Sequence, residues 1–451
     1  MRQLRYIASF VLCTLSLWAF SQDVVRLGER DLVGTARYVG MSGAMTAIGG
    51  DPSAVRDNPA GLGLYRRTEV TFTFDYSFDR TLQADNSTLG PRRTRRGIVP
   101  QAAVVLAFGD PYIDEGIVSN NIMFSYHRLR TYSRSFLTAA NGGPSMAAMI
   151  AETGVDLGID YPKAYYNDFN RFQLTETGIV DEYSFDWSMN FSHRVYFGMG
   201  LHVQSYTHNG EANYEELFDH YSLDGKQYYL QNQSSLLLAG VGCTFSLGLI
   251  YRPCRWCRLG VSVETPSLGG LGTYTAGTIY AQTDSAGSSA APRQSSFDRS
   301  YHSPLRLSTS AAVQLGNYGM ISFQYDYARC ASYADVHSLR AGLEIVPIPG
   351  MYINAGYTYE WNKNRTGSGN ADYIVPIDPS LNRQDTYFMN LHTTQYASAG
   401  LGYRGRHVTV QAAYQYRWQR LNLYAHAGQP YPFFADTHRI VFTIGWHRAW
   451  P

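Results

Sequence analysis

Charged residues are scarce in this sequence. Asp, Glu, Lys and Arg make up 16% of the 451 residues, whereas soluble globular domains usually carry about 25%. The formal net charge is +1, so nothing in the charge balance attracts a nucleic acid or another polyanion. No apolar run of roughly 18 or more residues follows the N-terminal region, which excludes helices that span a membrane there.

Cysteine is also rare. The chain holds five, and Cys254 and Cys257 have the spacing of a redox or zinc site. The sequence offers neither a second pair of ligands nor the helical context of a thioredoxin-like site. We therefore expect a short disulfide or two free thiols in a tight turn, with no metal and no cofactor.

Motifs for catalysis are missing as well. The sequence has no Gly-x-Ser-x-Gly and no compact Ser/His cluster, so we predict that the protein is not an enzyme. Twelve histidines leave haemin binding open as an alternative, and His202 and His208 fall on one face of a predicted strand. Their spacing is not that of a recognised ligand pair.

The N-terminus has the pattern of a secretory signal peptide. Arg2 and Arg5 give a positive start, residues 6–20 are apolar, and small residues precede the predicted mature start near Gln22. We therefore assign residues 1–21 to a signal peptide.

Aromatic residues and glycine are abundant, and much of the chain alternates apolar with polar side chains. Residues 70–78, 321–327, 408–418 and 439–446 show this period of two, in which one face of a strand is apolar and the other polar or small. The whole chain predicts strands near 68–78, 97–108, 119–134, 177–191, 195–208, 233–250, 257–266, 303–315, 319–329, 335–345, 351–361, 394–403, 406–418 and 437–447. Strands of this length cross a bilayer when tilted.

The predicted connections alternate between short and long, apart from 330–334. The short ones are 109–118, 192–194, 251–256, 316–318, 346–350 and 404–405, and the long ones are 79–96, 135–176, 209–232, 267–302, 362–393 and 419–436. An up-and-down barrel with periplasmic turns and external loops gives this pattern. A closed sheet also pairs every backbone group within lipid. We predict an all-β fold, a 14-stranded antiparallel transmembrane β-barrel with an N-terminal plug, or hatch.

The predicted hatch precedes the first strand. Residues 36–64 are dense in Gly and Ala, sparse in charge, and end in Asn58-Pro59-Ala60-Gly61. Pro59 fixes its own φ and biases Asn58 toward extended geometry, and Asn58 can hydrogen-bond backbone nearby. The motif either only turns the chain toward the wall or also holds the hatch in the lumen.

We accordingly divide the chain into a signal peptide (1–21), a hatch (22–67) and a barrel (68–451). The mature sequence resembles the FadL/TodX family of outer-membrane channels for hydrophobic compounds, in its Bacteroidetes-type branch. The residues that carry the resemblance are Gly40-Met41-Ser42-Gly43-Ala44, Ala47-Ile48-Gly49-Gly50-Asp51 and Asn58-Pro59-Ala60-Gly61-Leu62.

The resemblance implies a multi-pass protein of the Gram-negative outer membrane. It implies passive uptake of small hydrophobic molecules such as long-chain fatty acids, and no energy-coupling box is evident near the predicted mature start. We expect a monomer whose partners are outer-membrane lipid, lipopolysaccharide and a hydrophobic ligand, with no nucleic acid. Relatives in a protein-secretion apparatus share this barrel, so a non-transport scaffold for protein binding or secretion is the alternative, beside haemin binding.

Two sets of side chains are candidates for solute binding. Residues 145–153 predict a short helix with Ser145 as N-cap, and the predicted capture residues on and beyond it are Met146, Met149, Ile150 and Phe169. The candidate lumen charges are Arg306, Arg340, Arg417 and Arg439. These arginines either pair with other charges and hatch backbone, or one of them meets the carboxylate of an amphiphile.

Overall fold

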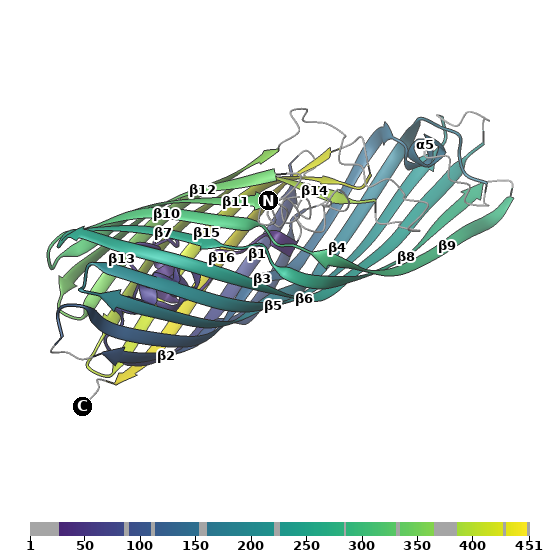
Figure 1. Ribbon diagram of the computed structural model, residues 1–451. Coiled ribbons are helices and arrows are strands. Elements are labelled where there is room, and N and C mark those ends of the chain that lie inside the picture. The colour runs from purple at the N-terminus through teal and green to yellow at the C-terminus, as the bar shows by residue number, and fades with distance from the viewer. Residues whose placement is uncertain are drawn as a thin grey trace, which may run out of the picture.

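The computed structural model describes most of the chain (Figure 1). The described residues are 27–84, 90–109, 113–152, 160–220, 226–283, 286–330, 334–364, 386–426 and 430–448. The predicted signal peptide lies outside them. Among the helices of the described part, none has both the length and the apolar character needed to cross a membrane.

Sixteen strands form one antiparallel sheet, and the first pairs with the last, so the sheet closes on itself. The strands are β1 (Thr68–Gln83), β2 (Arg92–Gly109), β3 (Ile117–Pro144), β4 (Tyr166–Phe191), β5 (Val195–Phe218), β6 (Tyr228–Cys254), β7 (Cys257–Glu264), β8 (Leu268–Thr283), β9 (Ala286–Tyr301), β10 (Leu305–Gln314), β11 (Gly319–Cys330), β12 (Ala334–Ile348), β13 (Met351–Asn364), β14 (Phe388–Arg404), β15 (Val408–Tyr424) and β16 (Pro430–Arg448).

Four of these strands occupy only two positions in the wall. β7 and β8 both pair with β6. β8 pairs with residues 228–243 of β6, and β7 pairs with residues 246–254. β10 pairs with β7, and β9 pairs with β8. The barrel therefore has fourteen strand positions, as the sequence predicts, and the fold class is confirmed.

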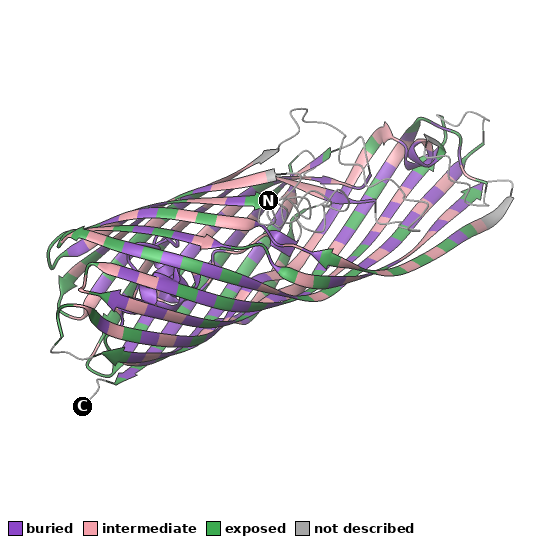
Figure 2. Cartoon of the chain, viewed as in Figure 1, coloured by how far each residue is buried: buried purple, intermediate pink, exposed green. Residues whose placement is uncertain are grey.

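The side chains alternate across the wall as the period of two requires. In β1 the outward Val70, Phe72 and Phe74 are exposed, while the inward Thr73 and Asp75 are buried. The same banding runs round the barrel (Figure 2). An apolar outer face and a polar lumen are the arrangement that suits a barrel in lipid.

Many strands are far longer than a bilayer needs. β3 has 28 residues and β6 has 27, against the roughly 9–11 of a tilted spanning strand. The prediction of long loops was wrong at 267–302, which forms the two strands β8 and β9, and at 209–232, where most residues extend β5 and β6. At 135–176 it was partly wrong, because β3 and β4 take up about half of these residues on either side of a short helix. Small and polar side chains do not prevent this, since the hydrogen bonds to neighbouring strands satisfy the backbone.

The wall is lower on one side. β10, β11, β12 and β13 have 10 to 15 residues, and β8 and β9 extend beyond them, away from the end at which β16 finishes (Figure 1). Among the described strands, β9 pairs only with β8.

The hatch lies inside the end of the barrel at which β16 finishes (Figure 1). It contains α3 (Ala36–Gly40), α4 (Pro52–Asp57) and the 3₁₀ helix η1 (Pro59–Leu64). α3 packs against β13 to β16, and η1 packs against β4, β5 and β6. A fourth helix, α5 (Met146–Glu152), lies at the opposite end of the molecule.

Wall glycines allow the hatch to lie directly on the backbone of the strands. A Cβ built on Gly198 would overlap Pro59, one on Gly248 would overlap Asn58, and one on Gly356 would overlap Met41. At these points a side chain on the wall would displace the hatch.

Cys254 and Cys257 are register partners at the two-residue turn between β6 and β7, and both are free thiols.

Candidate functional site

The Asn58 motif joins two segments of the hatch. Asn58 ends α4 and caps η1, with its Oδ1 accepting from the Ala60 N–H at 3.1 Å. Its Nδ2 donates to the Thr46 carbonyl at 2.9 Å. The Gly50 N–H donates to the Gly61 carbonyl at 3.1 Å, because these loops approach without intervening side chains. The motif therefore folds the hatch onto itself as well as against the wall.

All four predicted lumen arginines contact the hatch. Arg306 donates to the Gly28 carbonyl at 2.5 Å and Arg439 to the Leu32 carbonyl at 3.0 Å. Arg340 donates to the Tyr38 hydroxyl at 3.2 Å.

Two of these arginines also pair with carboxylates of the wall. Arg340 lies 2.8 Å from Asp326, and Arg439 lies 2.8 Å from Asp75. The structure thus places the four arginines in contacts with protein groups. Whether any of them also meets a solute stays a prediction.

Ion pairs link the hatch to the wall, and each of the two supplies both positive and negative partners. The hatch guanidiniums of Arg30 and Arg37 pair with wall carboxylates, Glu264 at 2.7 Å and Glu344 at 2.7 Å. In the opposite sense, Asp31 of the hatch accepts from two wall arginines, Arg130 at 3.2 Å and Arg417 at 3.1 Å. This reciprocal pattern fixes the position of the hatch.

The electrostatics of Asp31 show how strong this coupling is. Burial by itself would raise the pKa of Asp31, but the Arg130 and Arg417 guanidiniums outweigh it and hold that pKa well below its usual range. The carboxylate therefore stays ionised within the barrel and binds the hatch to two strands on different parts of the wall.

A cavity is lined by residues of the hatch and of the barrel wall. Its empty volume is about 1480 Å³, counting the part that is open to solvent. Its charged lining residues are Glu29, Arg30, Asp31, Arg56, Asp57, Arg128, Arg130, Glu264, Arg306, Asp326, Arg340, Glu360 and Arg417. Acidic and basic groups are nearly balanced, so the cavity is polar without selecting one sign of charge.

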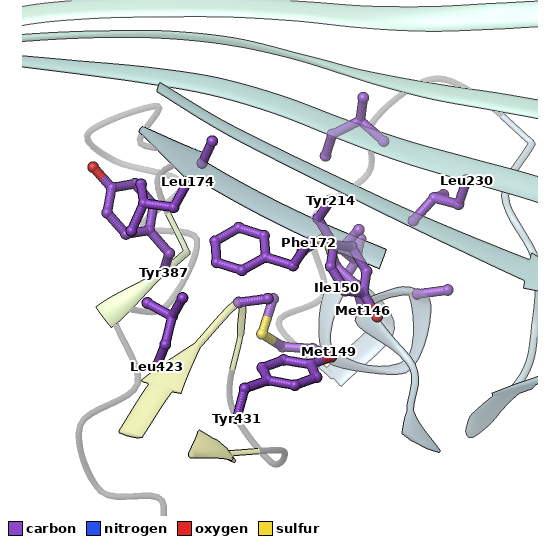
Figure 3. Close-up of a cluster of buried hydrophobic side chains, with 14 of the residues drawn as sticks. Met146, Met149, Ile150, Phe172, Leu174, Tyr214, Leu230, Tyr387, Leu423 and Tyr431 are labelled. Atoms are coloured by element: carbon purple, nitrogen blue, oxygen red, sulfur yellow. The ribbon is translucent and has the colours of Figure 1, made fainter. Parts of the chain in front are cut away.

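Beyond the cavity, toward the far end, the lumen becomes apolar. On β15 the inward residues change from Arg417 and Gln419 to Leu421 and Leu423. The apolar cluster there contains side chains from α5 and several strands; Figure 3 shows Met149, Phe172 and Tyr431 directed toward one another. A polar compartment and an apolar compartment thus follow one another along the barrel axis.

The helix α5 is held inside the wall by a buried carboxylate. Glu216 on β5 accepts from the Met146 N–H at 3.1 Å and the Ala147 N–H at 3.2 Å. Ser145 caps the helix, as predicted, by accepting from the Ala147 N–H at 3.0 Å. These bonds satisfy amide groups that the first turn of a helix leaves free.

The predicted capture residues fall into two environments. Met146, Met149 and Ile150 are buried in the apolar cluster, not displayed to solvent at the outer mouth. Phe169 lies on β4, is half-buried, and is not part of that cluster. Their role toward a solute stays a prediction.

Known proteins resemble this chain in structure, and the likeness was not found in sequence. No protein-family model and no curated protein sequence matches the chain. The FadL homologue of Pseudomonas aeruginosa superposes with a TM-score of 0.57 at 12% identity, over 94% of this chain and 100% of the homologue. The Pseudomonas putida toluene transporter TodX gives 0.55 at 12%, over 94% and 100%. The monoaromatic hydrocarbon channel CymD gives 0.51 at 13%, over 93% and 99%.

The chain has the FadL and TodX fold. At this level of identity the likeness concerns the arrangement of the backbone, and it extends over nearly the full length of each partner. Residues of this FadL-type barrel must therefore be interpreted from their own contacts.

Several charged groups that pair between the hatch and the wall of the FadL-type barrel were not predicted from the sequence. Arg56 of the hatch pairs with Glu182 of β4, and Arg130 of β3 pairs with Asp31. Glu182 carries a signal in the sequence, because it belongs to a predicted strand and lies on its polar face. Arg130 does not, since a register shift between Arg128 and Arg130 changes the face on which the side chain falls.

The two histidines considered for haemin are buried among protein groups. His208 Nε2 lies 3.2 Å from Glu176, and its ring packs edge-on against Tyr132. His202 Nε2 lies 3.1 Å from the Ser246 hydroxyl. Both imidazoles are held by side chains of the barrel wall. Haemin binding stays a prediction.

Proposed function

We propose that this chain is an outer-membrane channel for the passive uptake of small hydrophobic molecules, with long-chain fatty acids as the substrate class that the lumen fits best. The FadL and TodX fold supports the general activity, since TodX is described as a toluene transporter and CymD as a monoaromatic hydrocarbon channel. The outward-facing apolar band supports a location in lipid.

The observation that carries the fatty-acid assignment is the sequence of compartments along the axis. Leu421 and Leu423 line the apolar part, and Arg417 lies four residues before Leu421 on the inward face of β15. An amphiphile could place its chain among the apolar side chains and its carboxylate among the arginines. A pure hydrocarbon would use only the apolar part, since it has no group to offer the guanidiniums.

Entry requires the apolar cluster to open. Met146 and Met149 of α5 lie in the apolar cluster at the far end of the barrel, and their flexible thioether chains can repack around different solutes. Release requires the hatch to move, because it fills the lumen at the other end and is tied to the wall by ion pairs.

Uptake by cells that lack the protein tests this proposal. Deletion should lower the initial rate of uptake of a radiolabelled long-chain fatty acid, and the intact gene should restore it. An alkane of equal chain length is the matched solute, because it lacks the carboxylate; its uptake should change less. Unchanged fatty-acid uptake together with lost secretion or adhesion would instead support the scaffold role.

A further inference from the structure

A cluster of metal-ligating side chains lies on the lumen wall beside α4. Glu182 on β4, His202 on β5 and Glu264 on β7 each offer one ligand atom, and these atoms all lie within 4.8 Å of one another. All three side chains are buried. One imidazole and two carboxylates form a donor set of the kind that Zn²⁺ and similar divalent ions prefer.

Two buried atoms in this cluster make no hydrogen bond. They are His202 Nδ1 and Asp186 Oδ1. The imidazole is oriented from its other side, where Nε2 lies 3.1 Å from the Ser246 hydroxyl, and Nδ1 then faces Glu182 Oε1 at 3.5 Å. His202 Nδ1 thus lies within ion-pair distance of Glu182 without hydrogen-bond geometry, and His202 Nε2 also lies 3.4 Å from Asp186 Oδ1.

Neighbouring side chains also orient the two carboxylates. Gln204 Nε2 donates to Glu182 Oε2 at 2.7 Å, and Thr244 donates to Glu264 Oε1 at 3.4 Å. Such outer contacts hold the ligands of a metal site in position and raise its affinity.

The guanidiniums that neutralise this cluster both belong to the hatch, among the described residues. Arg56 donates to Glu182 at 2.9 and 3.1 Å and lies 3.6 Å from Glu264. Arg30 pairs with Glu264 at 2.7 Å. Movement of the hatch would therefore leave two buried carboxylates without their counter-charges, which is costly in a low dielectric.

We propose that Glu182, His202 and Glu264 form a binding site for a divalent cation of the Zn²⁺ class, which the Arg56 guanidinium occupies when the hatch is seated. The metal and Arg56 compete for the same carboxylate oxygens. Because the two exclude each other, cation binding favours the displaced hatch, and a seated hatch weakens cation binding by the same factor.

Metal binding to the purified full-length protein tests the site. Arg56→Ala vacates the position of the guanidinium while the ligands remain. In chelator-washed protein titrated with Zn²⁺, this variant should bind one ion per barrel at least about tenfold more tightly than the unmodified chain, within the range usual for coupled sites. Arg56→Lys keeps the positive charge and should not gain affinity.

The hatch offers a matched control in Arg37→Ala. Arg37 also makes a bidentate pair with a wall carboxylate, Glu344, at 2.7 and 2.9 Å. Glu344 is not part of the cluster with His202, so this variant should gain no Zn²⁺ affinity. Equal affinity in the Arg37 and Arg56 variants would overturn the proposal.

Adding His202→Ala to the Arg56→Ala variant should abolish the gain, and Co²⁺ absorption should report loss of the nitrogen ligand. Retained tight binding would overturn the assignment. If Arg56→Ala does not fold, the unmodified protein tests the site by its conductance in a planar bilayer. Zn²⁺ should raise this conductance, and His202→Ala should remove the response. No effect of Zn²⁺ would count against the site. None of these measurements depends on fatty-acid uptake.

Discussion

Arg56 in the hatch and Glu182 in the barrel wall form a bidentate ion pair, with N–O distances of 2.9 and 3.1 Å. The side chains are 8% and 0% exposed, so neither is solvated well enough to stand alone. Because each neutralises the other, this contact holds the seated hatch to the barrel wall.

Removing one partner should therefore destabilise the protein strongly. We expect Arg56→Ala, measured with chelator present, to lower the free energy of unfolding by about 3–5 kcal/mol, because it leaves a buried carboxylate unpaired. The double variant Arg56→Met with Glu182→Leu removes both charges and should recover most of that loss. Equal instability of the single and double variants would contradict this account.

The wall glycines predict a specific effect on hatch position. Gly248→Ala introduces a methyl group where Asn58 Oδ1 lies, so the hatch should shift and the channel conductance should rise. Gly270→Ala is the control, because a Cβ there meets nothing within 4 Å. Single-channel recording compares the two, and the idea fails if both variants conduct alike while running as folded barrels on unheated gels.

The apolar cluster at α5 predicts a defect in solute capture. Met149→Asp with Ile150→Asp places carboxylates among buried apolar side chains and should lower fatty-acid uptake severalfold. Tyr165→Asp with Tyr166→Asp changes side chains that are 68% and 56% exposed and should leave uptake close to normal. The amount of each protein in the membrane must match before the rates are compared.

Acid should loosen the hatch through Asp31. The folded-state pKa of Asp31 lies below its unfolded value because Arg130 and Arg417 outweigh the effect of burial. Its contribution to stability is therefore complete above the unfolded pKa, near 3.9, and is lost as pH falls through the lower folded pKa. Thermal unfolding should show Asp31→Asn to be less stable than the unmodified chain at neutral pH, with the gap narrowing toward pH ~2. A gap that does not depend on pH would contradict the coupling.

The alternation of residues specified the wall well. In β1 the outward Phe72 and Phe74 and the inward Thr73 and Asp75 follow directly from a period of two. The lengths of the strands did not follow, because β8 and β9 are rich in small polar residues and are strands through pairing with their neighbours. Pairing partners distant in sequence are not visible in a local pattern.

The site was only partly predictable for a similar reason. The polar faces of the strands identified Arg417 and Arg439 as lumen residues, yet nothing local showed that Asp31 would meet Arg417 across 386 positions of sequence. The helix at Ser145 was predicted from its cap. That it would fold inward depends on Glu216, which belongs to another strand.

The wall glycines beneath the hatch affect the width of the passage that opens when the hatch moves. Gly198, Gly248 and Gly356 leave the strand backbone bare at three points where the plug now lies on it. Withdrawal of the plug would therefore uncover shallow hollows on two separate parts of the wall, β5 with β6 and β13, where the peptide groups stay hydrogen-bonded between neighbouring strands. Each hollow would add width to the opened passage without adding a charged or polar side chain there.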